Sequence, residues 1–245
     1  LERASREAIE RSVRMLGATK AKSSRLCVVF DPRVTSTLLG VLGGAMSGES
    51  VAKGRSFFEG RLGEQVAVEG FTLVEDPTDP SAFTASVIDG EGLACRRTDL
   101  IVDGLLTSFV FDSVAARRMG TRSTGSAVRG GYAGTPGAGV RALTLAPGGL
   151  GPAEILAQVG DGLYVQSITG VHSGVSTVSG DFSVGAEGLM IRDGQLAEPV
   201  REITVASTLQ RMLFSVVAIG SDLTRLPGVA AGQTLAIADF QLSGS

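Results

Sequence analysis

The chain has 245 residues, of which 43% are hydrophobic and 19% charged, and its formal net charge is -3. This length allows one large domain or two small ones, with enough residues for a sizeable core. No run of Lys and Arg concentrates positive charge, so nucleic acid is not expected as a direct partner. No apolar stretch reaches the roughly 20 residues that a membrane-spanning helix needs, so no membrane contact is expected either.

The two cysteines give information about the compartment. Cys27 and Cys95 lie far apart, and neither belongs to a CxxC motif. No disulfide framework is therefore indicated, which favours a reducing, cytoplasmic location.

The N-terminal segment predicts an amphipathic helix over Leu1–Leu16, ended by Gly17. The chain starts with Leu rather than Met, so we interpret residues 1–22 as the linker from a missing N-terminal domain. A helix packed on the domain formed by residues 23–245 is the alternative.

The next elements alternate between short strands and helices. A strand is predicted at Arg25–Phe30, followed by an N-cap at Asp31, a first-turn proline at Pro32 and a helix over Val34–Ser47. Further elements are predicted along the middle of the chain: strands at Phe71–Asp76 and Leu100–Ser108, a helix at Ser113–Met119 and a long loop at Gly120–Gly139.

The C-terminal half predicts mostly strands. A helix at Pro152–Val159 ends at Gly160, and the turn Asp193-Gly194 joins the two strands of a hairpin. The two hairpin strands are predicted at Phe182–Ile191 and Gln195–Ile203. Further strands are predicted at Arg141–Ala146, Leu163–Ile168 and Gln233–Leu242, and a helix at Thr208–Ser215. Long crossovers are few. The pattern predicts an α+β fold with a mainly antiparallel, twisted or barrel-like sheet and a few packed helices.

Catalytic motifs are scarce in this sequence. His172 is the only histidine, so a zinc site built on several histidines cannot form within the chain. A Ser-His-Asp arrangement of His172 with Ser173, Ser179 or Asp181 has weak support, because no GxSxG motif is present. A structural or peptide-contacting role for His172 is favoured. Arg122 and Arg129 of GTRSTGSAVRGG could hold an anion, but the segment lacks the GxxxxGK(S/T) motif and a mobile loop is the favoured interpretation.

Several long blocks of the chain resemble one known family. The blocks GVHSGVSTVSGDFSVGAEGLMIRDGQLAEPVREITVAS, RSTGSAVRGG and LTLAPGGLGPAEILAQVGDGLYVQSITG resemble the TldD/PmbA family, once called modulators of DNA gyrase. GESVAKGRSFFEGRLGEQVA and TDLIVDGLLTSFVFDS agree with it as well. The resemblance implies that residues 23–245 form a C-terminal domain of the TldD/PmbA type.

The family contains two kinds of subunit. TldD-like chains carry a zinc-binding HExxxH helix and a later cysteine ligand, and resemble metallopeptidases that cut short or unfolded peptides. PmbA chains, also called TldE, pair with them and lack this motif. Here the corresponding helix segment, Gly40–Ala45, reads GVLGGA, and Val217–Ser221 holds no cysteine. The segment Ser179–Ser183, SGDFS, resembles the PmbA version.

The resemblance therefore implies a PmbA/TldE-like, non-catalytic subunit of a metallopeptidase complex. No catalytic residue and no metal ligand are expected in this chain, and zinc is expected in a TldD-like partner. That partner would form a heterodimer with this chain, although self-association is also considered. The residues predicted to contact peptide or partner are Arg129, His172, Ser173, Ser179, Asp181 and Phe182. The alternatives are a hydrolase with an unrecognised active site and a homodimeric peptide-binding module without protease activity.

Overall fold

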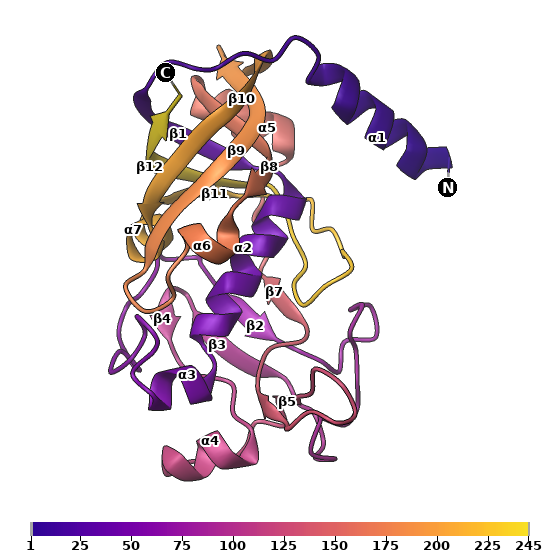
Figure 1. The fold of residues 1–245 in the computed structure, drawn as a ribbon, viewed down its shortest axis with the longest axis vertical. Helices are drawn as coiled ribbons and strands as arrows, with labels where there is room; N and C mark the ends of the chain where they lie inside the picture. The colour runs from indigo at the N-terminus through magenta and orange to yellow at the C-terminus, as the bar shows by residue number, and fades with distance from the viewer. Residues whose placement is uncertain (1, 245) are drawn as a thin grey trace.

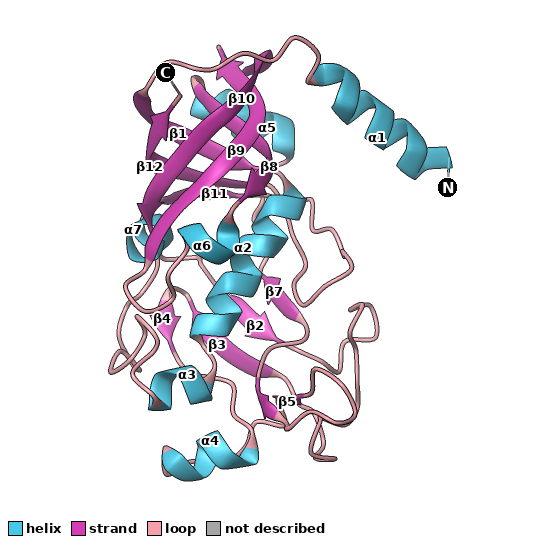
Figure 2. Cartoon of the chain, in the orientation of Figure 1, coloured by secondary structure: helices cyan, strands magenta, loops and turns pink. Residues whose placement is uncertain are grey.

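The computed structural model describes residues 2–244, with side chains from Ser5 onward. It contains a β-barrel at one end and a smaller sheet at the other, with helix α2 (Pro32–Ala45) running between them (Figure 1). Helices are few, and much of the smaller part is loop (Figure 2). The α+β fold with a mainly antiparallel, barrel-like sheet that the sequence predicts is confirmed.

Five strands close the barrel. They are β1 (Ser24–Phe30), β8 (Gly162–Thr169), β9 (Asp181–Arg192), β10 (Gln195–Thr208) and β12 (Leu235–Ser243). They are hydrogen-bonded in the order β1-β8-β9-β10-β12, and β12 pairs antiparallel with β1 to complete the ring. β1 and β8 are parallel, whereas the other pairs are antiparallel. A sixth strand, β11 (Val216–Ile219), extends the sheet from β12.

The hairpin of β9 and β10 forms as the sequence predicts. Its register places Arg192 opposite Gln195, so Asp193 and Gly194 make the turn, and both have positive φ angles of 48° and 74°. A positive φ suits glycine, and aspartate tolerates it better than most residues. β10 continues beyond the predicted end at Ile203 as far as Thr208.

The smaller sheet has the strand order β4-β3-β2-β7. Its strands are short: β2 (Leu73–Glu75), β3 (Thr98–Val102), β4 (Leu105–Leu106) and β7 (Leu143–Leu145). Two further strands of two residues each, β5 (Ala127–Val128) and β6 (Gly137–Ala138), pair within the long predicted loop. The remaining helices are α1 (Glu2–Arg14), α3 (Gly48–Ala52), α4 (Ser113–Arg118), α5 (Pro152–Val159), α6 (Val171–Gly174) and α7 (Leu209–Phe214).

One hydrophobic core runs from the barrel into the smaller sheet. Alternating residues of the barrel strands point inward, and the rings of Phe30 and Phe182 both contact the ring of Phe240 edge to face. Leu39 and Leu42 of α2 belong to the same core, which therefore joins the two parts. A second cluster lies outside the barrel, where Ile155 of α5 covers Val29.

Helix α1 contacts the domain through its polar side. Arg11 forms an ion pair with Asp31 and donates a hydrogen bond of 3.0 Å to the carbonyl of Gln166. The apolar side chains Ile9, Val13 and Leu16 point away and are 63%, 57% and 74% exposed. The apolar face predicted from the sequence is therefore present, but it does not pack on this domain. None of the described helices combines the length and the apolar character needed to cross a bilayer.

Candidate functional site

Helix α2 begins where β1 ends, because Asp31 and Pro32 stop the strand and start the helix. The Asp31 carboxylate accepts a hydrogen bond of 2.9 Å from the Arg33 amide, which caps the helix, and Pro32 occupies its first turn. The same carboxylate accepts a hydrogen bond of 2.9 Å from the Tyr164 hydroxyl. Burial, reinforced by the charge of Asp31, raises the pKa of Tyr164, so its hydroxyl stays protonated and keeps donating.

One side of α2 is apolar and buried, and the other is accessible. Thr37 and Gly44 are exposed on that second side, and Gly40 is half-buried there. A Cβ at Gly40 would lie 3.6 Å from Val229, so the segment around Val229 flanks the helix. A Cβ at Gly44 would meet no atom within 4 Å. We refer to Thr37, Gly40 and Gly44 as the α2 strip.

The segment 170–182 runs from the end of β8 into the start of β9 and carries five of the six predicted contact residues, four of them polar. A bridge between Val175 and Phe182 folds it into a tight loop, and Gly174 packs so closely that a Cβ there would lie 1.9 Å from the Ser183 carbonyl. The loop is tied to α2 indirectly. The Phe57 amide donates to the Thr177 carbonyl at 2.9 Å, while the Ser56 hydroxyl donates to the Ala45 carbonyl of α2 at 2.6 Å.

Polar side chains of this loop are exposed. His172 and Ser173 lie on α6, and the Ser173 hydroxyl donates to the Gly170 carbonyl at 3.2 Å. The Ser179 hydroxyl donates to the Asp181 carboxylate at 2.6 Å. Gln210 of α7, which the sequence analysis did not identify, donates to the Ser179 carbonyl at 3.0 Å. Gln210 and Ser179 are 31 positions apart in the sequence, so no local signal points to this contact.

The other two predicted residues lie in different environments. Phe182 is 1% exposed and packs in the barrel core against Phe240, because it alternates with the exposed Asp181 and Ser183 along β9. It therefore supports the loop from within rather than lining the surface. Arg129 is exposed and follows β5. Its side chain donates to the Gly90 carbonyl at 2.7 Å. Among the described residues, no hydrogen bond connects Arg129 with His172.

A buried carboxylate, that of Glu75, lies at the end of β2 in the smaller sheet. The Glu75 carboxylate is fully buried and accepts hydrogen bonds from the Arg141 and Ala142 amides at 2.8 and 3.1 Å. Burial raises the pKa of Glu75 to about 7, against the lowering effect of these amides. The Arg141 side chain donates to the Ala127 carbonyl at 2.7 Å, which links β5 to the segment whose amides bind Glu75.

Comparison with known proteins places these features in a family. Residues 23–244 match the model of the PmbA/TldA metallopeptidase C-terminal domain. The chain belongs to the PmbA/TldD family. The metalloprotease PmbA of Escherichia coli O157:H7 is 31% identical over 234 residues, which are 96% of this chain and 49% of that protein. A metalloprotease of Methanothermobacter thermautotrophicus is 31% identical over 243 residues, or 98% of this chain and 53% of its own length.

Solved structures show the same fold. A putative modulator of DNA gyrase from Bacteroides thetaiotaomicron is 30% identical, with a TM-score of 0.84 over 98% of this chain and 52% of that one. TldE from Thermococcus kodakarensis is 24% identical, with a TM-score of 0.89 over 98% of this chain and 55% of that one. The chain thus spans about half the length of the PmbA/TldD relatives it matches.

The family name implies a metal, and the side chains of the Gly40–Ala45 segment offer it no ligand atom. On the correspondence that the family resemblance implies, the two histidines and the glutamate of HExxxH would fall at Gly40, Val41 and Ala45, and none of these residues has a side-chain donor atom. Ala45 is also fully buried. Across residues 2–244, the structure brings together no group of three His, Cys, Asp or Glu side chains that could hold a metal ion.

Proposed function

We propose that this chain is a PmbA/TldE-like subunit of a peptidase complex of its family, in which a TldD-like subunit supplies the zinc site. The observation that supports this proposal most strongly is the composition of the α2 segment Gly40–Ala45. The helix is well formed and partly accessible, yet it offers no donor atom to a metal at the positions of the family motif. The metalloprotease names of the relatives supply the reaction class.

In this proposal the chain contributes a surface rather than a catalyst. The α2 strip leaves room for a polypeptide backbone, because glycines hold no side chain there. His172, Ser173, Ser179 and Asp181 would add polar contacts from segment 170–182, and Arg129 would add a separate cation. Such a subunit would wall a chamber that admits short or unfolded peptides and excludes folded proteins.

The test is to purify the chain alone and together with an HExxxH-bearing sister protein from the same genome. Zinc content and cleavage of a fluorogenic peptide are then measured on each sample. The proposal predicts no stoichiometric zinc on this chain alone, and both zinc and cleavage in the mixed complex. One tightly bound zinc on the isolated chain, with cleavage, would favour the hydrolase alternative. A stable homodimer that ignores the sister chain would favour the peptide-binding module.

A pair of variants tests whether the α2 strip lines the peptide path. Gly44→Trp places a large side chain in open space on α2, whereas Gly149→Trp does the same before α5 on the outside of the barrel. A Cβ added at either glycine would have no neighbouring atom within 4 Å, so both variants should fold. We expect the first to slow peptide cleavage by the assembled complex and the second to leave it unchanged. Equal rates for the two variants would remove α2 from the peptide path.

A further inference from the structure

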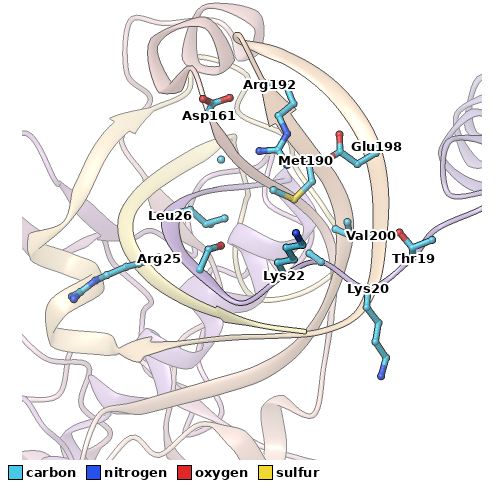
Figure 3. Close-up of a pocket in the computed structure, with 13 residues that line it drawn as sticks. Thr19, Lys20, Lys22, Arg25, Leu26, Asp161, Met190, Arg192, Glu198 and Val200 are labelled. Carbon is cyan, nitrogen blue, oxygen red and sulfur yellow. Dashed lines mark hydrogen bonds and ion pairs between the residues drawn. The ribbon is translucent and has the colours of Figure 1, made fainter. Parts of the chain in front are cut away.

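We propose that the open end of the barrel, opposite α2, binds a short zwitterionic peptide with apolar side chains. A cavity of about 670 Å³ opens there between residues 19–26 and the ends of β8, β9 and β10 (Figure 3). We call it the barrel mouth. Small-molecule sites in proteins usually have volumes of about 300–1,000 Å³, and barrel mouths are a common place for them.

The floor of the barrel mouth is apolar. Leu26, Met190 and Val200 belong to β1, β9 and β10, and they are the layer of barrel side chains nearest this opening. Met190 and Val200 are 5% and 2% exposed, so they form the top of a packed core rather than a free surface. A leucine-sized side chain placed on this floor would remove its own apolar area from water, since the floor beneath it is made of aliphatic and thioether groups.

The rim of the barrel mouth carries charges of both signs. Figure 3 shows Lys22 extending over the floor, with Asp161 and Arg192 on the rim above it. Arg192 is already paired with Glu198 at 2.8 Å. Lys22 forms no ion pair with any of the described residues, and the carboxylate of Asp161 accepts one long hydrogen bond of 3.4 Å from the Asp193 amide.

One ammonium and one carboxylate therefore retain hydrogen-bonding capacity beside an apolar floor. A free peptide presents the complementary set, because its carboxylate can pair with Lys22 and its α-ammonium with Asp161. Its side chains would then lie against Met190 and Val200. Arg25 and Lys20 also line the opening, but Arg25 pairs with Asp239, and Lys20 points away from the floor in Figure 3.

The barrel mouth is separate from the α2 strip. β1 starts at the mouth with Ser24 and ends at Phe30, one residue before the cap of α2, so the mouth lies about 20 Å from the start of α2 at 3.3 Å per residue. The inference does not rest on the proposed function. The segment that connects α1 to β1 forms part of the mouth, because its residue Thr19 pairs with Val200 on the wall. A bound peptide would tie this segment to β8 through Lys22 and Asp161.

The test is titration calorimetry of the whole chain with leucyl-leucine and two blocked relatives. N-acetyl-leucyl-leucine lacks the ammonium, and leucyl-leucinamide lacks the carboxylate. We expect the free dipeptide to bind with one site per chain and each blocked form to bind about tenfold or more weakly, since each loses a charge-assisted hydrogen bond.

Two lysine variants provide the matched control. Lys22→Met keeps the length and apolar stem of the side chain, and we expect it to weaken binding of leucyl-leucine about tenfold or more. Lys53→Met removes the same charge at the end of α3, outside the lining of the barrel mouth, and should change the affinity less than about twofold. Thermal unfolding of both variants checks that they are folded. The proposal is wrong if leucyl-leucine does not bind at millimolar concentration, if the blocked forms bind as well, or if Lys22→Met binds like the wild type.

Discussion

Two adjacent glycines of α2 should respond in opposite directions to the same substitution. Gly44→Ala adds a methyl group to an open helix position, and alanine is favoured over glycine in a helix by about 0.5–1 kcal/mol. Gly44 lies in the last turn, so the lower value applies. Gly43→Ala adds the same methyl group 2.5 Å from Val140 and 2.6 Å from Leu143.

The cost at Gly43 follows from these distances. Carbon atoms pack best at about 3.5–4.0 Å, so the two neighbouring side chains must move by about 1 Å. Overpacking of this kind costs about 1–3 kcal/mol, which exceeds the helix-propensity gain. We expect Gly43→Ala to be destabilised by about 1 kcal/mol and Gly44→Ala to be stabilised by about 0.5 kcal/mol.

Thermal unfolding followed by circular dichroism measures the difference. For a chain of this size, 1 kcal/mol corresponds to about 2–4 °C in Tm. Gly44→Ala should therefore melt about 1–2 °C above the wild type, and Gly43→Ala about 2–4 °C below it. Val140→Ala should reduce the loss in the Gly43→Ala background, because it removes the methyl groups that clash. If Gly43→Ala melts as high as Gly44→Ala, the packing of α2 described above is incorrect.

Three further predictions concern charges and close contacts. Burial raises the pKa of Glu75 from 4.5 to about 7, so the folded state binds the carboxyl proton more tightly than the unfolded state does. The free energy of unfolding should therefore fall by about 3 kcal/mol in all as the pH rises from about 4.5 to 7. Urea unfolding at pH 5 and pH 8 measures this dependence of stability on pH, and Glu75→Gln should reduce it. If the Glu75→Gln variant keeps the same pH dependence as the wild type, other groups cause it. Asp31→Ala loses both the cap of α2 and the partner of Arg11, whereas Asp31→Asn keeps an acceptor for the cap, so the alanine variant should be less stable by about 1 kcal/mol. Equal urea midpoints for these two variants would contradict the capping role. Gly174→Ala places a methyl group 1.9 Å from the Ser183 carbonyl and should lower the free energy of unfolding by about 1–3 kcal/mol. Amide hydrogen exchange in segment 170–182 should become faster. An exchange rate equal to that of the wild type would show that the loop accommodates the methyl group.

Local signals account for the elements that the sequence predicts well. Asp31-Pro32 marks the start of α2, Gly160 ends α5 with a φ of 70°, and Asp193-Gly194 fixes the hairpin register. Each of these depends on the backbone preference of one or two residues. The four-residue strand β11 carries no such signal, and the sequence does not predict it, because its identity depends on pairing with β12.

Long-range contacts account for what the sequence could not supply. The parallel pairing of β1 with β8 joins residues more than 130 positions apart, and the barrel mouth draws on four separate segments. For the candidate site, the sequence could predict that Ser179 and Asp181 lie close together on one exposed turn, because they are two residues apart. The burial of Phe182 could have been inferred from the alternation of residues along β9, because neighbouring residues such as Asp181 and Phe182 point to opposite faces of the sheet.

Closure of the barrel has a consequence for how the protein opens. In an open sheet, an outer strand can detach and expose the amides of its neighbour, one strand at a time. Here β12 pairs with β1, so every strand of the ring is held on both sides along at least part of its length. Amide protons of this ring should therefore exchange together, in a single cooperative unfolding event, while those of the two-residue strands β5 and β6 exchange early.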